Sequence, residues 1–220
     1  MDLFPIFLKL TARRCLVIGA GNLAESKIES LRAAHASVTV IAPEAREHIL
    51  DLAASGEIEY HPRPYQPGDA QDYFLIVTAT NDGSVNRAVY QEAVANNTIC
   101  NAVDDPPFCD FYFPSVVRRG DLQIAISTAG ASPALAQRLR KEINAQLPLD
   151  TGDWLTDLGN LRREVTQREP LNEQRKLLLH QLASREVCGF DQCPSRVLAR
   201  QHAKKNPINP IPQPNTEPQP

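Results

Sequence analysis

The sequence has no run of consecutive apolar residues that approaches the roughly 18 to 20 a helix needs to span a membrane. Its start also lacks a basic segment followed by a long apolar stretch, which is the pattern of a secretory signal. These two absences predict a soluble chain that is not exported and does not bind membranes.

An excess of positive charge is absent as well. Lys and Arg total 23 against 26 Asp and Glu, so the net charge is −3, the wrong sign for a protein whose main partner is nucleic acid. The balance changes along the chain: residues 1–137 carry 10 basic and 16 acidic side chains, whereas residues 138–205 carry 13 and 9. The second segment is therefore the one that favours an anionic ligand.

Cysteines are few, odd in number and widely spaced. A chain of 220 residues does not depend on disulfides for its stability, so we expect reduced thiols and hence a cytoplasmic protein. Cys15 and Cys100 are expected to be buried in strands. Cys188 and Cys193 form a C-x₄-C pair near His180 and His202, without the regular spacing of a zinc site. Plain thiols are the favoured interpretation, and a zinc site is the alternative; no metal-ligating residues are predicted.

What is present is the composition of an ordinary globular protein, with 42% hydrophobic and 22% charged residues, which excludes collagen, coiled coil and mucin. Apolar, β-branched runs alternate with helical stretches over the first half of the chain. The predicted strands are 15–18, 38–42, 57–60, 73–79 and 98–103, and the predicted helices are 25–34, 44–55 and 84–96. This alternation predicts an α/β, Rossmann-like parallel sheet.

The pattern changes from Phe108 onward. Strand-like runs at 111–118 and 122–128 flank Arg119-Gly-Asp121, which predicts an antiparallel hairpin. Ser132-Pro133 supplies a cap and a first-turn proline for a helix, and residues 150–185 are predicted to be helical with a break near Pro170. The segment 206–220 contains six prolines and one charge, so we expect it to be disordered.

The segment Gly19-Ala20-Gly21-Asn22-Leu23-Ala24 matches the fingerprint G-x-G-x-x-G/A of dinucleotide-binding proteins. The first glycine permits a tight turn, and the second lacks a Cβ, so that the backbone can approach a pyrophosphate at the start of the following helix. The alternative is a glycine turn with no ligand. Because a strand precedes the fingerprint and a helix and second strand follow, we predict that it binds a dinucleotide.

The residue expected to bind the ribose lies at the end of the second strand, about 20 residues further on. That position holds Ala42, and Glu44 follows beyond Pro43 with no arginine immediately beside it. These features favour NAD over NADP.

Two further segments follow strands at the carboxyl edge of the predicted sheet. Residues 78–82 are expected to approach the cofactor through their backbone, while their side chains are better explained as a helix cap. Asp104 follows the fifth predicted strand and is a candidate general base, the alternative being a solvated carboxylate in a turn.

Together these motifs resemble, in order and spacing over residues 3–165, the dehydrogenase/ferrochelatase module of siroheme synthase. The segments that carry the resemblance are 4–7, 15–27, 38–43, 78–82, 101–104 and 127–136. Two positions depart from the usual pattern of the family: Ser26 stands where Arg is frequent, and Thr128 stands where Ser is frequent but keeps the hydroxyl.

The resemblance implies NAD-dependent oxidation of precorrin-2 to sirohydrochlorin, followed in many members by insertion of Fe²⁺, or of Co²⁺ in some relatives. It implies a homodimer and, since the chain stops at 220, no fused methyltransferase domain. Asp104 would be the catalytic acid or base. The residues expected to bind the cofactor are Gly19, Gly21, Asn22, Leu23, Pro43, Glu44 and Thr80. Those expected to bind the polycarboxylate substrate are Thr128, Arg118 and Arg138, with Arg119 and Arg140 as further candidates.

The division expected from these patterns is an NAD-binding domain at 1–112, a dimerisation segment at 113–148, a helical domain at 149–205 and a tail at 206–220. Two other functions remain open at this point. One is a regulatory module that senses NAD without chemistry, and the other is a chelatase that has lost the dehydrogenation step.

Overall fold

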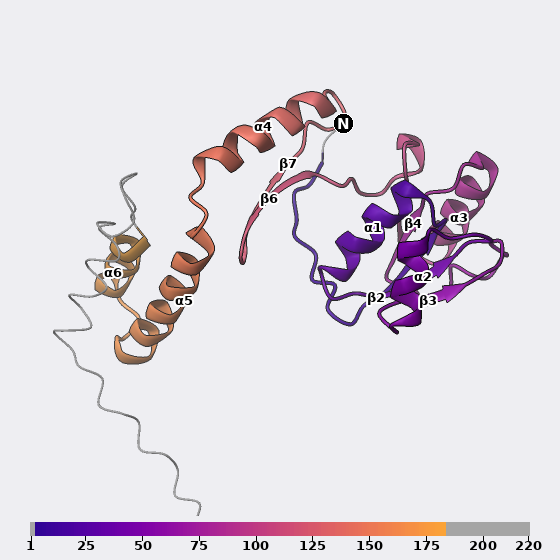
Figure 1. Ribbon diagram of the computed structural model, residues 1–220. Coiled ribbons are helices and arrows are strands. Elements are labelled where there is room, and N and C mark those ends of the chain that lie inside the picture. The colour runs from indigo at the N-terminus through magenta and orange to yellow at the C-terminus, as the bar shows by residue number, and fades with distance from the viewer. Residues whose placement is uncertain (1–2, 184–220) are drawn as a thin grey trace, which may run out of the picture. The chain divides into compact units, whose positions relative to one another are not determined.

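The computed structural model describes residues 3–183, and the chain divides into two compact units with the boundary between Phe113 and Pro114. The first unit is built on a five-stranded parallel sheet (Figure 1). Its strands are β1 (Arg14–Ile18), β2 (Ser37–Ile41), β3 (Glu59–His61), β4 (Leu75–Thr78) and β5 (Ile99–Ala102). Its helices are α1 (Asn22–Arg32), α2 (Glu47–Ala54) and α3 (Gly83–Ala95).

The strand order is β3-β2-β1-β4-β5, so the chain leaves β1 toward one edge of the sheet and returns to the other side of β1 with β4. This order confirms the predicted Rossmann-like α/β fold. In such sheets ligands bind at the carboxyl ends of the strands where the order reverses, here between β1 and β4.

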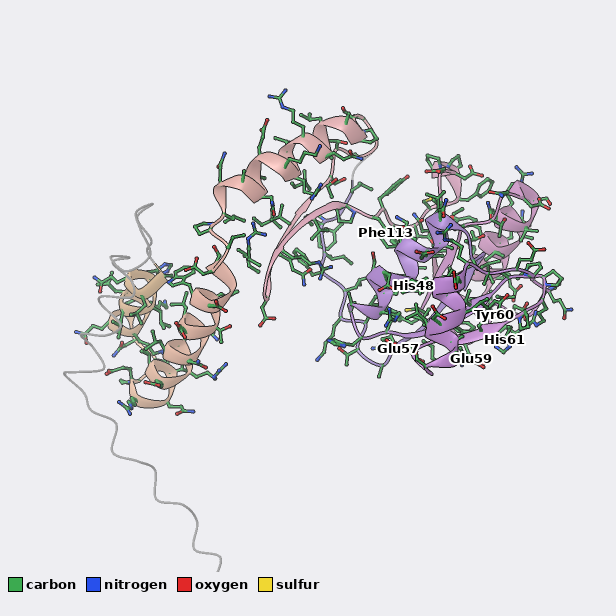
Figure 2. All side chains as sticks on the ribbon, viewed as in Figure 1. His48, Glu57, Glu59, Tyr60, His61 and Phe113 are labelled. Atoms are coloured by element: carbon green, nitrogen blue, oxygen red, sulfur yellow. The ribbon has the colours of Figure 1, made fainter. Side chains whose placement is uncertain are left out.

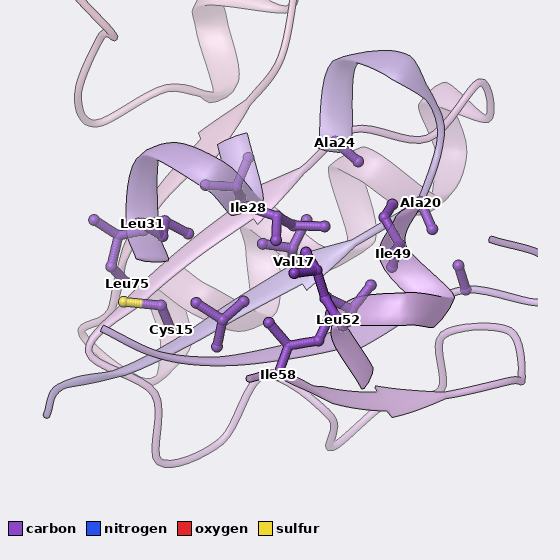
Figure 3. Close-up of a cluster of buried hydrophobic side chains, with 14 of the residues drawn as sticks. Cys15, Val17, Ala20, Ala24, Ile28, Leu31, Ile49, Leu52, Ile58 and Leu75 are labelled. Carbon is purple, nitrogen blue, oxygen red and sulfur yellow. The ribbon is translucent and has the colours of Figure 1, made fainter. Parts of the chain in front are cut away.

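Each face of the sheet has its own apolar core, because successive side chains of a strand point to opposite faces. Cys15 and Val17 of β1 belong to the cluster covered by α1 and α2, together with Ile28 and Ile49 (Figure 3). Leu16 and Ile18 belong to the opposite cluster, which contains side chains of α3. A central strand buried on both faces explains the continuous apolar sequence of β1.

The two strand cysteines are buried as expected and form no disulfide. Burial raises the pKa of the Cys15 thiol to about 11 and that of the Cys100 thiol to about 12. Both thiols therefore stay protonated at neutral pH and act as small apolar core groups.

The segment after β5 runs back along that strand and covers its edge. Past the short 3₁₀ helix η1 (Pro106–Phe108), the Asp110 backbone N–H donates to the Cys100 carbonyl, and its side chain accepts from the Cys100 N–H at 2.9 Å. The Asn101 side-chain amide donates to the Phe111 carbonyl at 2.7 Å. These bonds satisfy backbone groups that an edge strand would otherwise expose, and they fix the turn at Asp104 and the aromatic residues that follow.

Several predicted boundaries differ from the observed ones by a few residues, and two of the differences have a clear physical reason. The second helix begins at Glu47 instead of Glu44, because the extended Arg46 directs its N–H to the Ala20 carbonyl of the glycine turn at 3.3 Å. The first hairpin strand begins at Ser115 instead of Phe111, since Pro114 has no N–H to donate to a strand ladder.

The second unit contains the predicted antiparallel hairpin, β6 (Ser115–Arg119) and β7 (Leu122–Ile126). Gly120 in its turn has a φ of +56°, a conformation that favours glycine. Up to residue 183, three helices follow: α4 (Pro133–Gln146), α5 (Thr151–Arg168) and α6 (Glu173–Ala183). The predicted cap of α4 is confirmed, because the Ser132 hydroxyl accepts from the Leu135 N–H, and the predicted break separates α5 from α6.

No helix within residues 3–183 is long and apolar enough to cross a membrane. The expected disordered segment 206–220 and the cysteine pair Cys188 and Cys193 lie outside the described residues.

Candidate functional site

The glycine-rich turn places Gly19 against the end of the neighbouring strand β4. Gly19 has a φ of +106°, and a Cβ added to it would lie 2.5 Å from the Ala79 carbonyl oxygen. Its N–H donates to the Ile41 carbonyl at the end of β2 at 2.9 Å. A glycine is therefore required at position 19 for two reasons. The ends of β1, β2 and β4 meet there and leave no space for a Cβ, and the backbone has a positive φ.

Gly21, by contrast, faces open space. A Cβ added there would have no atom within 4 Å, and Gly21 caps α1 without any side-chain hydrogen bond. The first intrahelical bond runs from the Glu25 N–H to the Gly21 carbonyl, so the N–H groups of Asn22, Leu23 and Ala24 have no acceptor inside the helix. An open approach to free N–H groups at the positive end of a helix dipole fits a phosphate.

Asn22 and Leu23 are both exposed at this helix start, and the Leu23 side chain is 53% exposed. The first turn of α1 also contains Glu25, whose carboxylate would repel an anion. Arg46 offsets this charge, because its Nε lies 2.5 Å from a Glu25 carboxylate oxygen. The residues at the helix start therefore fit the pyrophosphate of a dinucleotide.

The end of β2 carries the groups predicted to meet the ribose. Pro43 and Glu44 are exposed there, and the Tyr60 hydroxyl of β3 donates to the Ala42 carbonyl at 2.9 Å (Tyr60 is labelled in Figure 2). Burial and the nearby Glu44 carboxylate raise the pKa of Tyr60. Tyr60 thus fixes the strand end from which Glu44 extends, a contact that the sequence did not indicate.

A buried amide organises the turn after β4. The Asn86 side-chain oxygen accepts from the hydroxyls of Thr78 at 2.5 Å and Thr80 at 2.8 Å, while its amide donates to the Thr80 carbonyl at 3.1 Å. The Thr80 hydroxyl is also bonded to the backbone of Asp82, which caps α3 through the Ser84 N–H. As expected, these side chains form hydrogen bonds within the turn. Because the Thr80 hydroxyl is used there, the backbone of Thr80 is the group more available to a ligand.

Asp104 lies at the same carboxyl edge, after β5. It is exposed and has a φ of +63°, a left-handed conformation that Asp adopts more readily than most residues. The turn is closed by a bond from the Asp105 N–H to the Ala102 carbonyl at 3.0 Å, and the Cys109 thiol lies 3.0 Å from the same carbonyl. The Asp104 carboxylate forms no ion pair among the described residues, which leaves it available to a ligand.

The predicted substrate residues all belong to the second unit. The Thr128 hydroxyl accepts from the Ser132 N–H at 3.2 Å, in a loop where Ala129 and Gly130 have φ values of +50° and +83°. This loop leads into α4, whose first turn is capped by the Ser132 hydroxyl.

The arginines of the second unit differ in how they are used. Arg118 is exposed, whereas Arg119 donates to the Asn144 and Leu147 carbonyls and so caps the end of α4. Arg138 is paired with Glu142 at 2.7 Å on the surface of α4. Arg119 therefore has a structural role, and the exposed Arg118 is more available than Arg119 or Arg138 to bind an anionic ligand.

No group of three or more His, Cys, Asp or Glu within residues 3–183 is arranged to hold a metal ion. His180 lies in α6, while Cys188, Cys193 and His202 lie outside the described residues.

Comparison with known proteins adds the following. Residues 6–115 match the family described as "Putative NAD(P)-binding", and residues 119–146 match "Sirohaem biosynthesis protein central". Over 177 residues the chain is 38% identical to a siroheme synthase of Methylobacillus flagellatus, covering 80% of this chain and 38% of that protein. Over 210 residues it is 36% identical to siroheme synthase 2 of Yersinia enterocolitica, covering 93% and 44%. The chain thus spans less than half the length of these relatives.

Among solved structures, the chain is similar to "SirC, precorrin-2 dehydrogenase". The TM-score is 0.78 at 25% sequence identity, and the likeness covers 93% of this chain and 100% of that one. The similarity therefore extends over both units and not only over the nucleotide-binding fold.

Proposed function

The chain belongs to the siroheme synthase dehydrogenase family, and from this premise we propose that it oxidises precorrin-2 to sirohydrochlorin with NAD. The observation that carries the proposal is the open start of α1 at Gly21, between the ends of β1 and β4. This turn lies within residues 6–115, which match the family described as "Putative NAD(P)-binding".

NAD supplies the hydride acceptor. The free N–H groups of Asn22 and Leu23 would bind its pyrophosphate, and the exposed Leu23 side chain would be covered by it. Pro43 and Glu44 at the end of β2 would bind the adenosine ribose. The backbone at Ala79 and Thr80 would border the cofactor on the other side of Gly19.

Asp104 is the proposed proton acceptor. Oxidation of precorrin-2 removes a hydride and a proton, and the proton needs a base within hydrogen-bond reach. Asp104 meets that need, because its exposed carboxylate forms no ion pair within residues 3–183 and a hydrogen-bonded turn holds it at the carboxyl edge of the sheet.

The second unit would bind the polycarboxylate substrate through Thr128 and Arg118. Arg138 would contribute only if it left Glu142, so we rank it below Arg118. The proposed division is an NAD-binding domain at 1–112, a dimerisation segment at 113–148 and a helical domain at 149–205, of which residues 184–205 lie outside the described part of the chain. We also propose that the chain acts as a homodimer in the cytoplasm.

Metal insertion is a second candidate activity. Insertion of Fe²⁺ or Co²⁺ as substrate into sirohydrochlorin releases two pyrrole protons, and the unpaired Asp104 carboxylate is suited to accept them. The tetrapyrrole nitrogens would themselves bind the metal, so this reaction needs no cluster of protein ligands.

The test is a paired assay. Purified protein with precorrin-2 and NAD should generate the absorbance of NADH, and omission of either reactant should abolish it. A folded protein that binds NAD but never produces NADH would exclude the dehydrogenase and favour a regulatory module. Sirohydrochlorin with Fe²⁺ or Co²⁺, without NAD, then tests metal insertion separately.

A further inference from the structure

Lys27 lies on the flank of the buried face of α1. The buried residues of this helix are Ala24, Ile28 and Leu31, and Lys27 is three residues after the first and four before the last. Residues at these spacings are neighbours on one helix face. Lys27 is accordingly half-buried, unlike the exposed Ser26 beside it.

An aromatic ring fixes the position of the Lys27 ammonium. Its Nζ lies 4.1 Å from the centroid of the Phe113 ring (Phe113 is labelled in Figure 2). Phe113 packs edge-on against Phe111, with the ring centroids 5.4 Å apart, and Phe111 is bonded to Asn101 of β5 through its carbonyl. The contact therefore joins α1 to the segment that follows the turn of Asp104.

Lys27 has no carboxylate partner among the described residues. The two acids of α1 are committed elsewhere: Glu25 pairs with Arg46, and Glu29 pairs with Arg32 and His48. Burial lowers the pKa of Lys27, and the charge of Asp104, which does not form a direct ion pair with it, raises that pKa in part. A half-buried cation without an ion-pair partner is stabilised by an anionic ligand.

We propose that Lys27 is a substrate-binding residue that holds one carboxylate of the tetrapyrrole beside Asp104. The inference rests on the proposed function and adds a cation to the neighbourhood of Asp104 within the first unit. A cofactor phosphate is the other anion that could reach this region. The substrate carboxylate is favoured for two reasons. Lys27 lies five residues, or about 7.5 Å along the helix axis, from the Asn22 N–H, where the cofactor pyrophosphate is proposed to bind. The charged group that acts on Lys27 is Asp104, the proposed proton acceptor of the substrate reaction.

The experiment compares three variants with the wild type. Lys27→Met keeps the apolar stem and can pack its sulfur against the Phe113 ring, but it removes the charge. Lys27→Arg keeps the charge. Lys9→Met removes the charge of an exposed lysine in the same unit and serves as the control. Each protein is first compared by its thermal unfolding midpoint, and Lys27→Gln replaces Lys27→Met if the latter does not fold.

Lys27→Met should raise the KM for precorrin-2 about tenfold or more, since charged pairs of this kind contribute upward of about 1.4 kcal/mol. The dissociation constant of NAD, measured by calorimetry without substrate, should stay within about twofold of the wild type, because the pyrophosphate is bound by backbone N–H groups. Lys27→Arg should restore most of the KM, and Lys9→Met should match the wild type. An unchanged KM, or a loss of NAD affinity as large as the loss of substrate affinity, would overturn the proposal.

Binding of sirohydrochlorin without NAD, followed by optical titration, separates this inference from the proposed reaction. If the wild type binds sirohydrochlorin but does not oxidise precorrin-2, the proposed dehydrogenase fails while the role of Lys27 is still measured. Weaker binding by Lys27→Met than by Lys9→Met supports that role. Equal binding by the two variants, or no binding by the wild type, refutes it.

Discussion

The Cα hydrogen of Gly19 that a side chain would replace points at Ala79: a Cβ in its place would lie 2.5 Å from the Ala79 carbonyl oxygen. This contact joins the turns after β1 and β4, on either side of the point where the sheet changes direction. The second glycine of the fingerprint, Gly21, has no atom within 4 Å of the corresponding position. Gly19 is thus required by the fold, whereas the proposed reason for a glycine at position 21 is the approach of a ligand.

This difference predicts two distinct phenotypes. Gly19→Ala should lower the free energy of unfolding by about 2 to 5 kcal/mol, through the clash and the unfavourable φ. Gly21→Asp should leave unfolding nearly unchanged but weaken NAD binding at least about tenfold, by placing a Cβ and a negative charge where the pyrophosphate would lie. Urea denaturation and calorimetry measure the two effects. Equal losses of stability in both variants would contradict the assignment.

Asp104→Asn should keep the fold, because Asn tolerates a positive φ as Asp does. Its amide cannot accept the proton, so kcat for NADH formation should fall about a hundredfold or more. Asp105→Asn makes the same chemical change at the next residue and should retain near wild-type turnover. Activity of Asp104→Asn comparable to that of the control would remove Asp104 from the mechanism.

Glu44→Gln should reduce the preference for NAD over NADP. The exposed carboxylate at the end of β2 would repel a 2′-phosphate, and its removal should improve relative NADP affinity about threefold to tenfold. Glu47→Gln, a nearby exposed position at the start of α2, is the control. The measurement is the ratio of the dissociation constants of the two cofactors, and a ratio that changes equally in both variants would argue against a ribose contact.

Asn86→Asp should destabilise the turn after β4. Asp cannot donate to the Thr80 carbonyl as the Asn86 amide does, and it brings a charge to a site that is only 6% exposed. We expect a loss of about 2 to 4 kcal/mol in the free energy of unfolding. Asn81→Asp, exposed in the same turn, should have little effect. If both variants unfold at the same urea concentration, the Asn86 network does not hold the turn.

The pair Arg63 and Asp69 predicts a dependence of stability on pH. The Arg63 guanidinium forms two 2.7 Å bonds to Asp69 and lowers the pKa of that carboxyl below its ordinary value of 3.8. The folded state therefore binds the proton less readily than the unfolded state, so the stabilisation is present above the unfolded pKa and is lost as the pH falls through the folded one. Asp69→Asn should unfold more easily at neutral pH.

The wild type and Asp69→Asn should then converge as the solution is acidified below about pH 4. The measurement is the urea midpoint as a function of pH, with Asp72→Asn, an exposed residue nearby, as the control. A constant difference between wild type and Asp69→Asn across this range would show that the carboxylate charge is not what stabilises the pair.

Much of the fold could be predicted because it follows from short-range rules. The apolar runs of β1, β2, β4 and β5, the glycine turn and the Ser132 cap each depend on residues within a few positions of one another. The wrong starts of α2 and β6 depend on a distant contact and on a proline, respectively. The start of α2 is set by a bond from Arg46 to Ala20, which no local pattern indicates.

The candidate site divides in the same way. The fingerprint and Asp104 could be found from their place after strands, whereas Asn86, Tyr60 and Lys27 could not be recognised as parts of a site. Lys27 gave one usable signal, its spacing from Ala24 and Leu31, which predicts partial burial of a charge. The ring that it contacts is 86 residues away in the chain, and that pairing depends on how the segment after β5 folds back.

The sequence by itself therefore determined the succession of strands and helices along the chain, the nucleotide fingerprint and the family. Backbone preferences and side-chain periodicity act over a few residues, so these features can be recognised without the structure. Only the tertiary structure decided which glycine serves the fold, which arginine caps a helix and which lysine lacks an ion-pair partner. Those roles depend on contacts between residues far apart in the chain, and such contacts exist only once the sheet and its covering segments have assembled.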